Sequence, residues 1–257
     1  MFVLTAGADP RVNEKILGGH NCKEDEAQYY VAICKGQCDT RRDVICGGTL
    51  IRPDWVLTAA HCDLPDETLK VISDAHDLQK PVMIYEVEKH IPHPHPHETG
   101  ADVYFDIMLL KLKKPINRNI REPTEEQCRR MNPLLTERHN PEPLRFLIAG
   151  HGIYGYDFRK PDPVKYPLFT DKLQCVTMNL TRCPENLNNN SKYSKNRFCA
   201  GGGGKATRQG DSGGGLVINS VVYGIVHRGN NKDTVGNTPG IYINVCAFRD
   251  WIMKTAV

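Results

Sequence analysis

Many short apolar runs, rather than long helical ones, constrain the fold of this 257-residue chain more than any other feature. Runs such as DWVLTAA, FDIMLLKL and LVINSVVYGIV are rich in Val, Ile, Leu, Tyr and Phe, and clusters of Gly, Pro, Asn and Asp separate them. This pattern is typical of short antiparallel strands folded into barrels or sandwiches. Helical spacing is clear only near the end, where Phe248, Trp251 and Ile252 recur at i, i+3 and i+4. An all-β fold with a C-terminal helix is therefore predicted.

Ten cysteines, an even number, indicate an oxidising compartment and a disulfide framework. No apolar run approaches the ~20 residues of a membrane span, and a net charge of +3 gives no reason to expect nucleic acid or an anionic membrane as partner. MFVLTAGA at the start is similar to the tail of a secretory signal peptide. We therefore expect a secreted, extracellular protein, in which Asn179 and Asn189 open two candidate glycosylation sequons.

The stretch GDSGGG, residues 210 to 215, raises the question of a nucleophilic serine at Ser212. A serine hydroxyl needs a histidine base that a buried carboxylate orients, and backbone N–H groups aimed at the developing oxyanion. His61 in TAAHC and Asp106 in FDIMLL supply the base and the carboxylate in apolar, strand-like surroundings. Gly210 lets the backbone turn, so that the N–H groups of Gly210 and Ser212 can point to one spot. Each residue alone is a weak signal, but the three together predict a catalytic triad.

These motifs, in the order His, Asp, Ser, resemble those of the chymotrypsin/trypsin family of serine peptidases, over nearly all of residues 16 to 257. The resemblance implies two antiparallel six-stranded β-barrels with the active site between them. It divides this peptidase domain into a first barrel at about 28–115, a linker at about 116–140, a second barrel at about 141–245 and a C-terminal helix at about 246–256. Residues 1–15 would be the remnant of a signal peptide and an activation segment.

The stretch ILGG, residues 16 to 19, resembles the mature N-terminus of that family. The resemblance implies that cleavage between Lys15 and Ile16 frees the Ile16 amine, which then pairs with Asp211. A buried carboxylate is costly until a cation reaches it, so this cleavage would order the oxyanion loop. A simple turn residue is the alternative interpretation of Asp211.

The cysteines fit the same resemblance. It implies four disulfides, and the two cysteines that remain flank the expected tip of a hairpin, where they can pair locally. The expected pairs are Cys22–Cys175, Cys46–Cys62, Cys128–Cys246, Cys183–Cys199 and the local pair Cys34–Cys38. Two further bridges of the family are missing with both of their halves, and Phe146 and Ile218 stand where one of them would be.

The resemblance also implies a pocket for the substrate side chain that precedes the scissile bond. Ala206, six residues before Ser212, would be its floor, and Gly229 and Gly240 would be its walls. An aspartate at the floor would select Lys or Arg, so Ala206 predicts an apolar or aromatic substrate residue, whose burial is worth about 2–3 kcal/mol. Such an enzyme would not cut after Lys15, so we expect a separate trypsin-like peptidase to activate it.

The stretch GIVHRG, residues 224 to 229, departs from the family's GIVSWG. His227 replaces a small serine that hydrogen-bonds the catalytic aspartate, and Arg228 replaces a tryptophan that lines the cleft. A second imidazole near Asp106 could compete with His61 and damage catalysis; alternatively, His227 turns to solvent. Two functions therefore stay open. One is a secreted serine endopeptidase, made as a zymogen and acting through an acyl-enzyme, and the other is an inactive homologue that binds proteins.

The stretch HIPHPHPHE, residues 90 to 98, alternates proline and histidine and favours an extended polyproline II segment. Its histidines point in different directions, which favours a solvated loop and leaves a zinc site as the alternative. Only Asp74 and Asp77 stand where a calcium loop of the family would be, so no calcium is expected. We expect no metal and no cofactor. The expected partners of this monomer are a protein or peptide substrate and an activating peptidase.

Overall fold

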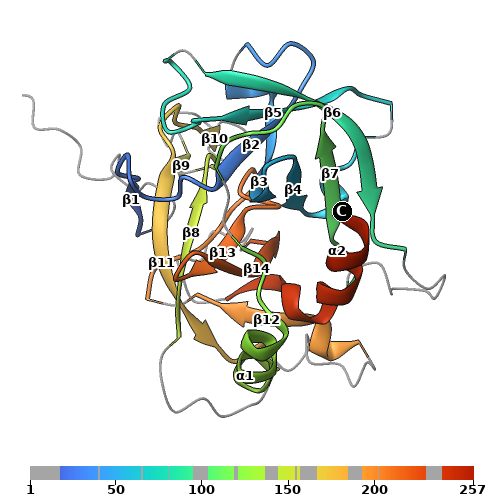
Figure 1. Cartoon of the computed structure of the whole chain (residues 1–257). Helices are drawn as coiled ribbons and strands as arrows, with labels where there is room; N and C mark the ends of the chain where they lie inside the picture. The colour runs from blue at the N-terminus through green and yellow to red at the C-terminus, as the bar shows by residue number, and fades with distance from the viewer. Residues whose placement is uncertain are drawn as a thin grey trace, which may run out of the picture.

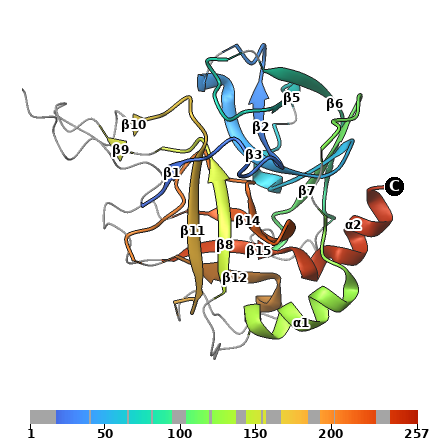
Figure 2. The ribbon, with the colours of Figure 1, turned by 60° about the vertical axis from the view of Figure 1, so that its left-hand side comes forward.

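The computed structural model describes residues 18–39, 41–64, 66–80, 82–94, 104–118, 121–136, 144–153, 155–156, 167–184, 193–201, 203–229 and 239–257. The expected activation bond between Lys15 and Ile16 and the sequon at Asn189 lie outside these residues. Figures 1 and 2 show two β units, one above the other, with the chain passing from the upper unit to the lower one.

The upper unit is a closed antiparallel barrel whose strands follow the order β2-β3-β4-β7-β6-β5. Its strands are β2 (Tyr30–Lys35), β3 (Val44–Arg52), β4 (Trp55–Thr58), β5 (Leu69–Ser73), β6 (Met83–Pro92) and β7 (Met108–Leu112). Their interior side chains, Ile33, Leu50, Leu57 and Ile72 among them, are almost fully buried. Closure of the sheet removes the free edges at which strands of other chains could pair.

The lower unit closes in the same way, because β11 pairs with β12 on one side and with β8 on the other. Its six strands are β8 (Arg145–Gly150), β11 (Gln174–Thr181), β12 (Arg197–Ala200), β13 (Gly215–Ile218), β14 (Val221–Arg228) and β15 (Gly240–Asn244). The short strand β1 (His20–Asn21) adds to β11, and β9 (Gly155–Tyr156) pairs with β10 (Pro167–Leu168). The rings of Phe146, Phe198 and Tyr242 pack against one another in its core, each tilted relative to the next. The predicted double barrel is thus confirmed, and Phe146, where a family disulfide is missing, fills the core instead.

A helix that the sequence interpretation missed lies in the expected linker. Helix α1 (Glu125–Thr136) begins at a capping box, in which Gln127 N donates to Thr124 Oγ1 (3.2 Å) and Thr124 N donates to Gln127 Oε1 (2.8 Å). Only Cys128 and Leu135 of this helix are buried, so its apolar pattern is weak.

The expected C-terminal helix is present as a 3₁₀ turn (Val245–Phe248) followed by α2 (Arg249–Thr255). Phe248 and Ile252 join the same buried cluster as the first barrel, so this helix is docked on the body of the protein. Figure 2 shows α2 at the side of the molecule opposite β11. In the described part of the chain, no helix has the length and apolar character needed to cross a membrane.

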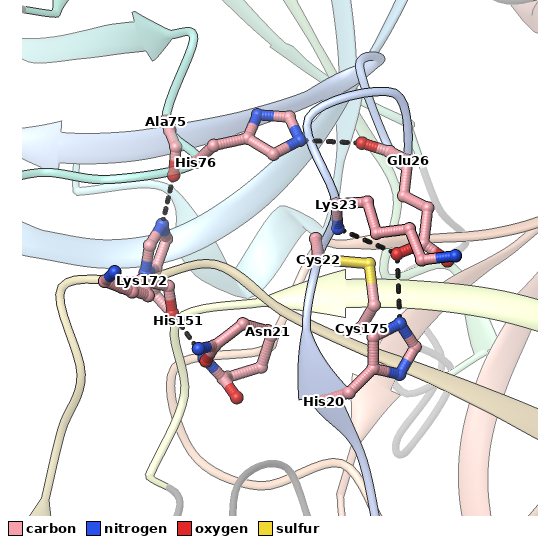
Figure 3. Close-up of a disulfide and its surroundings, with 11 residues drawn as sticks. His20, Asn21, Cys22, Lys23, Glu26, Ala75, His76, His151, Lys172 and Cys175 are labelled. Carbon is pink, nitrogen blue, oxygen red and sulfur yellow. Dashed lines mark hydrogen bonds and ion pairs between the residues drawn. A yellow bond between two sulfur atoms is a disulfide. The ribbon is translucent and has the colours of Figure 1, made fainter.

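Five disulfides hold the chain, and they join the same pairs that the resemblance and the hairpin geometry imply. They are Cys22–Cys175, Cys34–Cys38, Cys46–Cys62, Cys128–Cys246 and Cys183–Cys199. Figure 3 shows the bond between Cys22 and Cys175, which ties the segment next to β1 onto β11. Beside it, His20 Nε2 lies 3.0 Å from Glu26 Oε2, so both ends of this segment are fixed.

Candidate active site

His61 and Asp106 meet at the first barrel. His61 lies in a 3₁₀ turn (Ala60–Cys62) after β4, where the disulfide of Cys62 anchors it, and Asp106 lies just before β7. The backbone N–H of His61 donates to Asp106 Oδ1 at 2.7 Å, and the ring Nδ1 lies 2.7 Å from Oδ2. Because an ionised carboxylate only accepts hydrogen bonds, Nδ1 carries the proton and Nε2 is left as a base. The imidazole is 42% exposed, whereas the carboxylate is 5% exposed.

His227, on β14, reaches the same carboxylate. Its Nδ1 lies 2.5 Å from Asp106 Oδ2, and its side chain is 15% exposed. The alternative in which His227 turns to solvent is therefore wrong for this structure. Burial alone would raise the pKa of the Asp106 carboxyl, but the hydrogen bonds of His227 and His61 outweigh burial and hold this pKa well below its usual range. Asp106 is thus a buried anion that two imidazoles share.

The loop that carries Ser212 packs against strand β3 of the first barrel and strand β14 of the second. Gly47 N donates to Ser212 O at 2.8 Å, and Gly213 N donates to Val226 O at 2.8 Å, next to His227. Gly213 has a φ of +80°, and a Cβ there would lie 2.1 Å from Thr58 Oγ1. The loop thus lies between the barrels, beside the strand end that leads to His61.

The contact between base and nucleophile is not closed in this structure. Within the described residues, His61 hydrogen-bonds Asp106 alone, and no hydrogen bond joins it to Ser212. Catalytic hydrogen bonds are often long before substrate binds, so this geometry leaves the candidate pair in place.

Asp211, next to Ser212, is a buried carboxylate rather than a surface turn residue. Its exposure is 0%, and its oxygens accept hydrogen bonds from Gly152 N (2.8 Å) and Arg208 N (2.9 Å). Burial raises the pKa of Asp211 to about 6, against the lowering effect of these bonds and of nearby Arg41. Gly210, on its other side, has a φ of +95°, a conformation that favours glycine. The oxyanion loop therefore contains a carboxylate, that of Asp211, whose charged form is destabilised by burial.

Arg41 supports this loop, and the sequence interpretation missed it. It begins a 3₁₀ turn (Arg41–Asp43) before β3, and its guanidinium donates to the carbonyls of His151 and, at 3.0 Å, of Val44. A Cβ added to Gly210 would lie 3.4 Å from Arg41 Nη2, so the cation sits against the oxyanion loop. Two adjacent arginines in a polar turn carry no sequence signal for such a role.

His151 is the partner of Arg41 in the second barrel. It is fully buried, and its Nε2 lies 2.7 Å from the carbonyl of Ala75, as Figure 3 shows. Burial lowers the pKa of His151 to about 4, so this imidazole is neutral at physiological pH. It joins the two barrels just beside the Gly152 N–H that holds Asp211.

The described residues of the expected substrate pocket differ in burial and in the room around them. Ala206 is buried, whereas Arg228 is exposed. A Cβ at Gly229 would lie 2.1 Å from Thr207 O, and a Cβ at Gly240 would lie 2.7 Å from Tyr242 Oη. Gly229 therefore lies against the backbone of Thr207 in this conformation, and its role as a wall of the substrate pocket stays a prediction.

Comparisons with known proteins agree with this arrangement. The family model named Trypsin matches residues 16–252. Kallikrein 1-related peptidase b11 of Mus musculus is 33% identical, over 96% of this chain and 92% of its own length. Kallikrein-14 of Homo sapiens is 32% identical, over 94% of this chain and 84% of its own length.

Among solved structures, neuropsin, a serine protease expressed in the limbic system of mouse brain, superposes with a TM-score of 0.71 at 27% identity. The match covers 94% of this chain and 100% of the neuropsin chain. Fold, motifs and family model lead to one conclusion: the chain belongs to the trypsin family of serine endopeptidases.

Proposed function

We propose that this protein is a secreted serine endopeptidase, made as a zymogen, in which Ser212, His61 and Asp106 form the catalytic triad. The observation that carries the proposal is the double hydrogen bond from His61 to Asp106, through the backbone N–H and through Nδ1. This pair of bonds fixes both the orientation and the tautomer of the imidazole, which is the task of the carboxylate in a triad. The His61 side chain is 42% exposed, so it is accessible from solvent.

In this reaction Ser212 Oγ attacks the peptide carbonyl carbon while His61 Nε2 takes the hydroxyl proton. The negative charge that forms on the carbonyl oxygen is stabilised by the N–H groups of Gly210 and Ser212. The imidazolium then protonates the leaving amine as the C–N bond breaks, which leaves an acyl-enzyme on Ser212. Water, deprotonated by His61, attacks the ester, and the returning proton restores Ser212.

Two features of the site support a zymogen. Asp211 is buried with a raised pKa, so the arrival of a cation would lower its free energy. Gly229 lies against the backbone of Thr207, a close approach that narrows the expected pocket in this conformation. Cleavage after Lys15 would supply the cation as the Ile16 amine. Ala206 at the pocket floor supports an apolar or aromatic substrate residue and therefore a separate, trypsin-like activating peptidase.

A second candidate function rests on His227. This imidazole shares Oδ2 of Asp106 with His61, because the Nδ1 atoms of both rings lie within hydrogen-bond distance of that oxygen. A carboxylate oxygen can accept two hydrogen bonds, so sharing weakens the hold on His61 without removing it. If this weakening leaves His61 mobile, the chain would be an inactive homologue that binds proteins through the altered cleft.

Covalent labelling separates the two functions. The protein is cut after Lys15 with trypsin, treated with an organophosphonate and analysed by mass spectrometry of its peptides. We expect one phosphonate on Ser212 after cleavage, little on the uncut chain and none on Ser212→Ala. Verified cleavage of folded protein without an adduct would refute the enzyme and favour the binding homologue.

A further inference from the structure

Phe169 is a large apolar side chain that lies at the surface of the protein. It directly follows β10 and is 42% exposed. The guanidinium carbon of Arg41 lies over its ring, 4.7 Å from the ring centroid. A single exposed apolar residue is common and needs no explanation. Here, however, the exposed ring covers a cation that lies against the oxyanion loop, so its effect on that cation matters.

The guanidinium of Arg41 is held both at its edge and on its face. At the edge, Nη1 donates to the carbonyl of Val44 at 3.0 Å and Nη2 donates to the carbonyl of His151. The third nitrogen, Nε, is buried and has no hydrogen-bond acceptor among the described residues. An aromatic ring attracts a guanidinium through its face and needs no acceptor atom for this. Phe169 is therefore the contact that fixes the face of the guanidinium.

One peptide unit, between His151 and Gly152, connects Arg41 to Asp211. Its carbonyl accepts a hydrogen bond from Arg41 Nη2, and its N–H donates to Asp211 Oδ1 at 2.8 Å. Hydrogen bonds in series polarise one another, so a cation on the carbonyl makes the N–H at the other end a stronger donor. The position of the guanidinium is thus felt at the carboxylate of Asp211.

Asp211 stands between Gly210 and Ser212, whose N–H groups are the proposed oxyanion donors. Arg41 also approaches this loop directly, because a Cβ added to Gly210 would lie 3.4 Å from Nη2. Oxyanion donors are most effective when they are held in advance at the place where the charge develops. Whatever fixes Asp211 and Gly210 therefore acts on both donors at once.

We propose that Phe169 is a positioning residue of the peptidase. Its ring holds the Arg41 guanidinium on the carbonyl of His151, and Arg41 in turn holds the oxyanion loop through Asp211. Phe169 does this without touching the substrate. The effect on catalysis rests on the proposed function, whereas the connection from Phe169 to Asp211 does not.

Arg41 also acts on the charge of Asp211, which gives a readout that is independent of activity. This cation lowers the pKa of Asp211, against the raising effect of burial, and the other cation near the carboxylate is Arg208. Two further hydroxyls, of Tyr30 and Tyr242, interact with the same carboxylate, and burial raises the pKa of both, so they stay neutral. A guanidinium that is held less firmly stabilises the anion less. Loss of the Phe169 ring should therefore raise the pKa of Asp211.

This connection is tested in the uncut Lys15→Gln/Ser212→Ala protein, in which activity plays no part. The side-chain ¹³C signal of Asp211, identified by its loss in Asp211→Asn, is followed by NMR as the pH is changed. The variants are Phe169→Leu, which stays apolar but has no ring, and Phe169→Tyr, which keeps the ring. The control Ile84→Ala removes an apolar side chain of β6 that is 43% exposed, as Phe169 nearly is.

We expect Phe169→Leu to raise the midpoint pH of this titration by about 0.3–0.7, because a cation–π contact at a partly exposed site is worth about a two- to fivefold change in an equilibrium constant. Phe169→Tyr and Ile84→Ala should titrate as the parent protein does. In an Arg41→Gln background, Phe169→Leu should have no further effect, because no cation is left to hold. An unchanged midpoint in Phe169→Leu, or an equal rise in Phe169→Tyr, in Ile84→Ala or in the Arg41→Gln background, would overturn the proposal.

The effect on catalysis is measured after cleavage at Lys15, by labelling of Ser212 with a small organophosphonate over a range of concentrations. Phe169→Leu should lower the maximal labelling rate about two- to fivefold and leave the half-saturating concentration unchanged, and Phe169→Tyr should label like the wild type. A raised half-saturating concentration at an unchanged maximal rate would show that the ring contacts the ligand, which would overturn the positioning role. Absence of labelling in every cleaved protein, wild type included, would count against the proposed function and leave the titration result standing.

Discussion

The charge of Asp211 should contribute a destabilisation of the uncleaved protein at neutral pH that is absent at acidic pH. Burial raises the pKa of this carboxyl from 3.8 to about 6. A pKa difference of ~2 units corresponds to about 3 kcal/mol, by which ionised Asp211 destabilises the folded state. Above pH 6 the cost is present in full. As the pH falls from about 6 to about 4, the folded state takes up a proton that the unfolded state lacks, so the cost disappears.

The substitution Asp211→Asn isolates this term. It removes the charge, but an amide accepts from only one of the two donors, Gly152 N and Arg208 N, and the lost hydrogen bond costs about 1 kcal/mol. We therefore expect Asn to stabilise the uncleaved protein by about 2 kcal/mol at pH 7.5 and to destabilise it by about 1 kcal/mol at pH 4. Effects of the substitution that do not depend on pH are the same at both pH values. The difference between the two measurements therefore reports the charge of Asp211 alone.

Urea unfolding of Lys15→Gln/Ser212→Ala protein, with and without Asp211→Asn, measures the two differences. The first substitution keeps the chain uncut and the second prevents self-digestion. An equal effect of Asn at pH 4 and pH 7.5 would refute the reasoning, because it would mean that Asp211 is already neutralised in the uncleaved chain. Arg41, which lies near this carboxylate, is the group that would then supply the cation.

Three further substitutions test the contacts of the site. His227→Ser should raise the rate of Ser212 labelling about tenfold, as one stronger hydrogen bond to His61 lowers the barrier by about 1.4 kcal/mol; a slower rate would contradict the competition between the imidazoles. Arg41→Ala should lower the free energy of unfolding by about 2 kcal/mol, because the buried His151 carbonyl loses its donor; a change near zero in urea would exclude this clamp. Gly213→Ala should lower the free energy of unfolding by more than ~3 kcal/mol. The control Gly36→Ala, also at positive φ but with nothing within 4 Å of an added Cβ, should lower it by only about 1 kcal/mol. Equal losses would show that the backbone conformation, and not the contact with Thr58, sets the loss of stability.

The all-β class could be predicted because short β-rich runs with turn residues between them recur along the chain. The double barrel itself was implied by the resemblance of the three ordered motifs to the chymotrypsin/trypsin family, and the disulfides agree with it. Helix α1 was missed although Thr124 and Gln127 form a capping box, because a helix that buries so few side chains shows little periodicity. A search for capping boxes would have found it.

The arrangement around Asp106 could not be predicted in the same way. His227 was recognised as a departure, but its orientation depends on a carboxylate 121 positions away in the chain. The contact of Arg41 with His151 spans 110 positions and joins the two barrels. The close approach of Gly229 to Thr207 likewise depends on how two segments of the chain pack. Such long-range contacts are set by tertiary packing, which no local pattern reports.

The most direct test is a crystal structure of the protein after cleavage at Lys15. We predict that His61 still hydrogen-bonds Asp106 through Nδ1. We also predict that His61 Nε2 lies within about 2.6–3.2 Å of Ser212 Oγ. The same structure should show the walls at Gly229 and Thr207 apart. A cleaved, ordered protein in which His227 alone contacts Asp106 and His61 is turned away from Ser212 would contradict the account.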